Sequence, residues 1–234
     1  MRARRRPPVC FAAFESGVMK MVRAMSQRTE FVLVVLVAFA LPVLSSMASL
    51  FAPSTQPAIT EDGLRGLVVY EAIVLAGLLG LLRMRGWQRG HLGIVWSGWD
   101  APAAMLLTLV TAFACNAVDL ATRSLVKLPP QSTDALVAHG IPLATVALVS
   151  MVNPLFEELV LCGYVVGVLK PLRGAAFAIN VSTALRLSYH LYQGAPALQI
   201  IPVGLLFAGW YARTGRLWPV VLAHAAFDAM ALLQ

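Results

Sequence analysis

The amino-acid sequence predicts an all-α fold, a polytopic transmembrane helix bundle of about seven helices (six to eight) around an intramembrane polar cavity. Of the 234 residues, 59% are hydrophobic and 12% are charged, whereas a soluble domain usually carries about 25% charged residues. Apolar runs of the length that crosses a bilayer recur along the chain, with short connections between them. The polar residues inside these runs gather in the C-terminal half.

The distribution of basic residues favours a membrane protein over a nucleic-acid-binding protein. The formal net charge is +7, and many of the basic residues lie in the first thirty positions, directly before an apolar run. This arrangement follows the positive-inside rule. We therefore interpret residues 1–30 as a basic cytoplasmic tail and residues 31–234 as one transmembrane domain. We expect membrane lipid, but no nucleic acid, among its partners.

Three apolar runs predict the helices of the N-terminal half. The first covers residues 31–52 and contains Pro42, and the second covers residues 67–82 and contains Glu71. Glu71 is expected to face inward or to lie at the interface, and we assign it no function. The third run covers residues 101–121, and the mixed segment 123–140 after it could hold a short amphipathic helix.

The apolar run at residues 141–169 is too long for one straight crossing and is divided by Asn153-Pro154. Asn is favoured as an N-cap and Pro at the first helical position, so a new helix is predicted to begin at Pro154. The two pieces are either one kinked span or two elements. Apolar runs at 175–191, 198–212 and 217–233 predict the remaining helices.

The charges of the connections test this order of helices. Basic residues gather in the N-terminal tail and at 83–91, 170–173 and 213–216, whereas 53–63 and 193–197 have no Lys or Arg. If 141–169 counts as one crossing, all four basic segments fall on the same side. The pattern predicts seven crossings with a cytoplasmic N-terminus, as in a multi-pass protein of the bacterial inner membrane.

Six polar residues at membrane depth are candidates for function. Arg186 lies four residues before His190, so the two side chains are expected to share one helix face. His224 and Asp228 have the same spacing. Three helices would then turn polar stripes inward and line one wet cavity. The six residues are Glu157, Glu158, Arg186, His190, His224 and Asp228.

Carboxylates and imidazoles in such a cavity are the groups that activate water for hydrolysis. A buried carboxylate beside a like charge can act as a general base near neutral pH, and a histidine can share the proton. The same groups could instead hold a divalent metal such as zinc, with Glu157, His190 and His224 as ligands. Both routes stay open from these residues, so the cofactor is either such a metal or none.

Three motifs, "EELVLCG", "RLSYH" and "HAAFD", together resemble the CPBP intramembrane proteases. That family has the pattern Glu-Glu-x-x-x-Arg, then Phe-x-x-x-His, then His-x-x-x-Asn or Asp, and the matching part here is 153–233. It includes the type II CAAX prenyl endopeptidases and Abi-like bacterial relatives linked to bacteriocin processing or self-immunity. The resemblance implies an intramembrane endopeptidase that hydrolyses a peptide bond in a protein or peptide substrate.

The resemblance also implies catalytic roles for five residues. Glu157 would activate the water together with His190, and Glu158 would be structural or would orient its neighbours. His224 would line the oxyanion site. Because a carboxyl group donates to an oxyanion only when it is protonated, we expect Asp228 to orient His224 instead. The family is often labelled metalloprotease, although a metal-free Glu/His mechanism is also held for it.

Two positions depart from the family pattern. Cys162 stands where the family has Arg, and Arg186 stands where it has Phe. An Arg at membrane depth needs an anion. We therefore hypothesise that Arg186 supplies the missing cation to Glu158 from the neighbouring helix.

Two other functions remain alternatives at this point. A catalytically inactive relative, acting as a membrane scaffold or a bacteriocin self-immunity factor, is supported by Cys162 in place of the motif Arg. A proton-coupled transporter would also use Glu and His chains. Transporters usually show repeated halves with broken helices, however, and here the polar residues are confined to one half.

Overall fold

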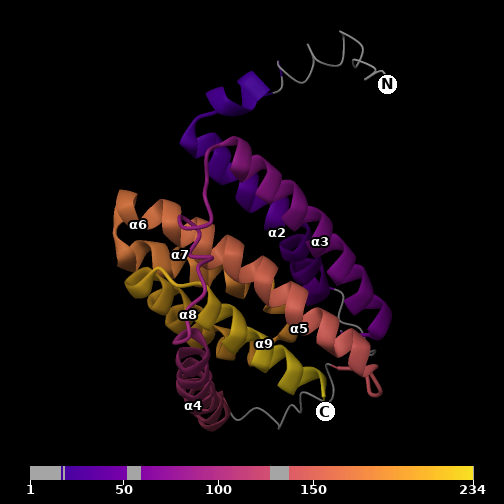
Figure 1. Cartoon of the computed structure of the whole chain (residues 1–234). Coiled ribbons are helices and arrows are strands. Elements are labelled where there is room, and N and C mark those ends of the chain that lie inside the picture. The colour runs from indigo at the N-terminus through magenta and orange to yellow at the C-terminus, as the bar shows by residue number, and fades with distance from the viewer. Residues whose placement is uncertain (1–16, 18, 52–58, 127–136, 234) are drawn as a thin grey trace, which may run out of the picture.

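The computed structural model describes residue 17 and residues 19–51, 59–126 and 137–233, and this part of the chain is helical without strands. The all-α prediction is therefore confirmed. The α-helices labelled in Figure 1 are α2 (Gln27–Phe51), α3 (Glu61–Met84), α4 (Asp100–Val126), α5 (Leu143–Glu158), α6 (Gly167–Arg173), α7 (Ala175–Ser188), α8 (Ile200–Thr214) and α9 (Trp218–Leu232). Between α5 and α6 lies the π-helix η2 (Leu159–Val166).

Some predictions concern residues outside the described part of the chain. Most of the basic tail, at residues 1–16, lies outside the described residues. The same holds for residues 52–58 of the first polar connection. The mixed segment at 123–140 is described only at its two ends: α4 continues to Val126, and the chain resumes at Val137.

Five helices of the described chain are long and apolar enough to cross a membrane: Gln27–Phe51, Glu61–Met84, Asp100–Leu125, Leu143–Arg173 and Ala195–Thr214. The protein is therefore a multi-pass membrane protein. The predicted crossings by α7 and α9 are shorter than expected, with 14 and 15 residues. At 1.5 Å per residue, such helices fall short of a hydrocarbon core about 30 Å thick.

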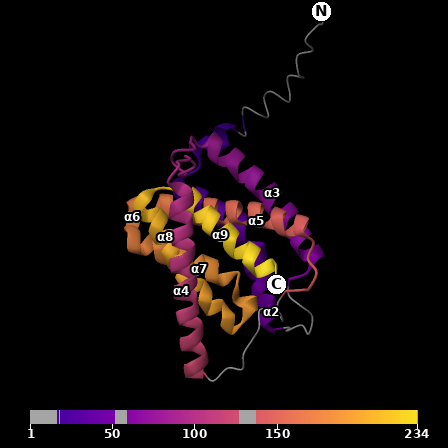
Figure 2. The ribbon, with the colours of Figure 1, turned by 60° about the horizontal axis from the view of Figure 1, so that its bottom comes forward.

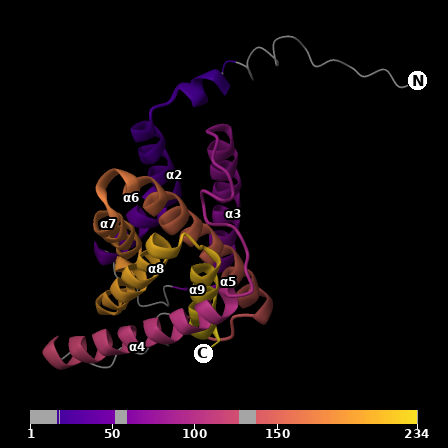
Figure 3. The same ribbon diagram turned by 60° about the vertical axis from the view of Figure 1, so that its left-hand side comes forward.

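The run from α5 through η2 crosses the middle of the bundle and ends in α6 at its edge (Figure 1). Helix α5 packs between α3 and α9, and η2 contacts α7 and α8. All eight residues of η2 are buried. Helix α4 packs on α8 and α9, on the side away from α2 and α3, as Figures 2 and 3 show. The C-terminal helices therefore surround the segment that carries the two adjacent glutamates.

The prediction that a new helix begins at Pro154 is wrong. Helix α5 runs through Asn153 and Pro154 without a break, and the helical run continues through η2 to Arg173. Pro154 lies inside a helix that packs against both α3 and α9, and Pro is tolerated within helices of membrane proteins. Because Asn153 lies inside α5 and does not cap a helix, its side-chain amide can form hydrogen bonds with other side chains.

The basic segments come together at one end of the bundle. Arg85, after α3, donates to the backbone carbonyls of Val22 and Arg23, which precede α2. Lys170 Nζ donates to the carbonyl of Ala212, near the end of α8. Basic segments that are far apart in the sequence therefore lie side by side, and the cytoplasmic position of the N-terminus stays a prediction.

Arg216 joins the start of α4 to this same end of the bundle. It lies between α8 and α9 and forms two hydrogen bonds to Asp100, of 2.7 and 2.9 Å. The side chain of Asp100 is fully buried. The connection between α8 and α9 is thereby fastened to the first residue of α4.

A small residue lets α7 approach α8 closely. A Cβ atom at Gly204 in α8 would lie 2.7 Å from Cγ2 of Thr183 in α7, a distance that side chains do not adopt without a shift. The glycine therefore permits a close helix contact of the kind common in membrane proteins. This contact holds α7, which carries Arg186, against the rest of the bundle.

Candidate active site

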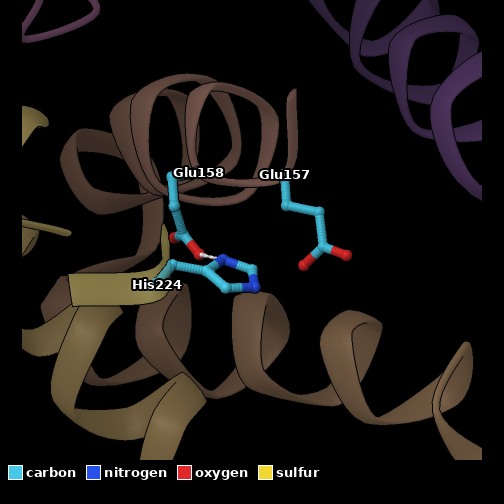
Figure 4. Close-up of side chains that lie close together, drawn as sticks. All are labelled: Glu157, Glu158 and His224. Atoms are coloured by element: carbon cyan, nitrogen blue, oxygen red, sulfur yellow. Dashed lines mark hydrogen bonds and ion pairs between the residues drawn. The ribbon is translucent and has the colours of Figure 1, made fainter. Parts of the chain in front are cut away.

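The adjacent glutamates end α5 and point into the bundle. Glu157 is 5% exposed and Glu158 is fully buried. Figure 4 shows both carboxyl groups extending from the same helix toward the imidazole ring of His224. The π-helix η2 begins at the next residue. Such turns of wider helix often occur at functional sites, and this one follows the glutamate pair directly.

Arg186 binds both glutamates. Its Nη2 atom lies 2.6 Å and 2.7 Å from the two carboxylate oxygens of Glu158, and its Nη1 atom lies 3.0 Å from Oε2 of Glu157. The predicted pairing of Arg186 with Glu158 is confirmed. The contact with Glu157 was not predicted. One guanidinium therefore neutralises part of the charge of two buried carboxylates.

The guanidinium is held by its surroundings as well as by the carboxylates. Arg186 is 1% exposed, and its Cζ atom lies 5.7 Å from the ring centroid of Phe207 in α8. A cation over an aromatic face gains further stabilisation in a desolvated site. The thiol of Cys162, at the position of the family Arg, donates a hydrogen bond of 3.2 Å to Glu158. It offers a weak donor but no charge.

His224 lies between two carboxylates. Its Nδ1 atom is 2.7 Å from Oε1 of Glu158, the contact drawn as a dashed line in Figure 4, and its Nε2 atom is 3.5 Å from Oδ1 of Asp228. The predicted spacing of His224 and Asp228 on one face of α9 is confirmed. The closer orienting partner, however, is Glu158 rather than Asp228.

His190 lies outside the helix in which it was predicted. Helix α7 ends at Ser188, and His190 follows in the turn after it. Its Nδ1 atom lies 2.9 Å from the backbone carbonyl of Arg186. Because a carbonyl only accepts, Nδ1 must carry the proton, which leaves Nε2 as the acceptor in the neutral ring. His190 is half-buried and interacts electrostatically with Glu157.

Three residues of the site were missed in the sequence. Asn153 donates from one amide nitrogen to Oε1 of Glu71, at 2.8 Å, and to Oε1 of Glu157, at 3.2 Å. The hydroxyl of Tyr189 donates to Oε2 of Glu157. Asn153 lies four residues before Glu157, a spacing that could have revealed it. No signal in the sequence places Glu71, which comes from α3, beside this pair.

The arrangement does not fit a resident metal ion. Ligand atoms of Glu157, Glu158 and His224 lie within 4.8 Å of one another, whereas the expected ligand His190 is not part of this group among the described residues. Each of the four carboxylate oxygens of the glutamate pair already accepts a hydrogen bond. A divalent ion would also have to displace the buried guanidinium of Arg186, or share the carboxylates with it.

Comparison with known proteins finds one similarity, in the C-terminal part of the chain. Residues 139–230 match the family described as type II CAAX prenyl endopeptidase Rce1-like. The match covers less than half of the 234 residues, and it agrees with the resemblance to the CPBP group. The matched segment contains all six polar residues singled out in the sequence but not Glu71. No curated protein and no solved structure matches the chain.

Proposed function

We propose that this protein, a membrane protein with an Rce1-like segment, is an intramembrane endopeptidase of the CPBP/CAAX type that hydrolyses a peptide bond with a water activated by Glu157 and His190. One observation carries the proposal. Two adjacent carboxylates are buried in the membrane domain against an arginine and within reach of a histidine. Such a group is costly at membrane depth and is typical of a functional site.

In this proposal, Glu157 is the general base. Asn153, Arg186 and Tyr189 donate to its two carboxylate oxygens and fix its orientation. The lone pair of Nε2 of His190 shares the proton as it leaves the water. The hydroxide that forms then attacks the carbonyl carbon of the scissile bond, a step to which a positioned base contributes about 100- to 10,000-fold.

His224 stabilises the oxyanion that this attack creates. Glu158 accepts from Nδ1 at 2.7 Å and fixes the ring, while Nε2 is held less closely by Asp228 at 3.5 Å. The Nε2–H group is therefore available to donate to the developing negative charge. Glu158 and Asp228 act as orienting carboxylates, and Arg186 keeps the charge of Glu158 balanced. No step requires a metal.

The substrate in this proposal is a protein or peptide at the membrane surface. The basic segments that meet at one end of the bundle support a cytoplasmic N-terminus, in a bacterial inner membrane, with anionic lipid beside them. The site would then cleave a chain that enters from the membrane or from its surface.

The test compares wild type with Glu157→Gln and His190→Gln in proteoliposomes mixed with native membrane proteins, reading new peptide termini by mass spectrometry. We expect termini that appear with the wild type and are at least about 100-fold rarer with Glu157→Gln. Glu61→Gln is the matched control, because it removes one carboxylate from a partly exposed pair with Arg65 at the start of α3 and leaves the site untouched. Identical termini with wild type and Glu157→Gln, when both are folded, would refute the protease and favour an inactive scaffold.

A further inference from the structure

A third carboxyl group, outside the Rce1-like segment, belongs to the same buried cluster. Glu71 lies in the middle of α3 and is 2% exposed. Its Oε1 atom accepts a hydrogen bond of 2.8 Å from the amide of Asn153, which also donates to Glu157. Glu71 interacts electrostatically with Glu157, Asp228 and His224. Helix α3 therefore delivers a carboxyl group to a site that the C-terminal helices otherwise build.

The surroundings of Glu71 and Glu157 differ in charge. Glu157 contacts the cation Arg186 and accepts from two further side chains. Glu71 accepts one neutral hydrogen bond, and no ion pair joins it to a cation in the part of the chain that the structure describes. A buried carboxyl group without a cation costs least in its neutral form. Where two carboxyl groups share a site, unequal surroundings assign one as acid and the other as base.

The second carboxyl oxygen of Glu71, Oε2, suggests a role for the proton that the neutral form of Glu71 carries. Within the described residues, Oε2 has no hydrogen-bond partner although it is buried. An unpaired buried oxygen costs about 1–3 kcal/mol of stability. A carboxyl group with only a structural role would gain nothing in return for this cost. The Oδ2 atom of Asp228, with which Glu71 interacts, is also buried and unpaired. Both oxygens lie in the cluster where a peptide bond would react.

We propose that Glu71 is a further catalytic residue, the acid that donates a proton to the nitrogen of the leaving amine. This inference rests on the proposed endopeptidase function. It divides the work between helices: Glu157 of α5 takes a proton from water, and Glu71 of α3 gives a proton to the nitrogen. Asn153 holds the two carboxyl groups at a fixed separation through one amide nitrogen.

The protons balance over one cycle. The water loses a proton to the carboxylate of Glu157, and its oxygen forms a bond to the carbonyl carbon. When the C–N bond breaks, the electron pair goes to nitrogen, which takes the proton of Glu71. The proton on Glu157 then passes to the carboxylate of Glu71, directly or through a water. One water is consumed, a carboxylic acid and an amine leave, and both glutamates return to their starting states.

The test uses Glu71→Gln, which keeps the shape and hydrogen-bonding atoms of the side chain but cannot give up a proton. The substrates are a peptide that the wild type cleaves and its ester analogue, in which oxygen replaces the scissile N–H. An alkoxide leaves without full protonation, whereas an amine does not. We expect Glu71→Gln to lower kcat for the amide by about 100-fold, within the range for general acids, and to leave the ester rate close to that of the wild type.

Two controls separate this role from a structural one. Glu157→Gln should lose amide and ester hydrolysis alike, because both need the activated water. Glu30→Gln changes a carboxyl group that is equally buried, at 3% exposed, but lies outside the site. It should leave the ratio of amide to ester rates unchanged. Equal losses on both substrates with Glu71→Gln, or no loss on either, would overturn the assignment while leaving the protease in place.

Infrared spectroscopy tests the protonation of Glu71 without hydrolysis. The wild-type protein should show a carboxylic-acid C=O stretching band that shifts in deuterated water and is absent in Glu71→Gln. If the band is unchanged by the substitution, Glu71 holds no proton to give and the inference fails, whatever the activity. If the band is present but the wild type cleaves nothing, the proposed protease fails and this step fails with it.

Discussion

Two buried carboxylate clusters in this protein differ in how completely their atoms are paired. In the first, Oε1 of Glu30 accepts from Nε1 of Trp87 at 2.9 Å and from the hydroxyl of Tyr164 at 3.1 Å, and Oε2 accepts from Arg85. Every side-chain polar atom of Glu30, Trp87 and Tyr164 therefore has a partner. This cluster joins α2, the segment after α3, and η2. Because all of these polar atoms are paired, we interpret it as a structural cluster.

The second cluster, around Glu157 and Glu158, is not complete. It contains an arginine and four carboxyl groups, and three of its buried atoms have no hydrogen-bond partner among the described residues: Oε2 of Glu71, Oδ2 of Asp228 and Nε of Arg186. Networks that are partly satisfied cost stability. Buried charge therefore occurs in both clusters, and the unpaired atoms set the second cluster apart from the first.

The largest expected effect comes from removing the central cation of the second cluster. Arg186→Ala leaves Glu157 and Glu158 buried side by side without a cation, and breaking such a pair costs about 3–5 kcal/mol. Arg85→Ala in the first cluster leaves Glu30 with two hydrogen-bond donors and should cost less, roughly 2 kcal/mol. Thermal unfolding in detergent measures both. A larger loss with Arg85→Ala would remove the distinction between the clusters.

Combining Arg186→Ala with Cys162→Arg sharpens the same comparison. The new arginine would lie one turn from Glu158, where the family pattern has it, and should restore part of the lost stability. The control is Cys162→Arg alone, which places two cations beside the pair and should destabilise the protein. If the double variant recovers neither folding nor activity, the idea that the charge has moved between helices is wrong.

A matched pair of smaller changes separates structure from chemistry. Tyr189→Phe removes a hydroxyl that donates to Glu157, and Tyr164→Phe removes one that donates to Glu30. Each should lower the free energy of unfolding by about 1.5–3 kcal/mol, the usual value for a hydrogen bond to a charged group. Only Tyr189→Phe should also lower kcat, because it alone contacts the base. Equal kcat values for the two folded variants would remove Tyr189 from the site.

The Arg186–Glu158 pair could be predicted from the sequence, because an arginine or a glutamate buried alone in the membrane is costly. Among the charged residues of the apolar runs, each offered the other the best partner of opposite charge. The His224–Asp228 contact was predictable from local spacing. Asn153 was missed although it lies four residues before Glu157, because the Asn-Pro pair was interpreted as the start of a helix, whereas α5 continues through Pro154. Glu71 was missed as well, since its contact with Asn153 spans 82 positions and depends on how α3 packs on α5.

The smallest expected effect is that of metal chelation, and it follows from the same arginine. Arg186 donates to both glutamates and lies where a divalent ion would need their oxygens. Treating the purified protein with EDTA or 1,10-phenanthroline should therefore leave kcat unchanged, and metal analysis should find less than one ion per chain.

Arg186→Ala is the informative control, since it frees the oxygens of Glu157 and Glu158 beside His224. If zinc stabilised that variant against heat but not the wild type, the guanidinium would be what excludes the metal. Inactivation of the wild type by chelator, reversed by zinc, would instead contradict the water activation proposed for Glu157 and His190.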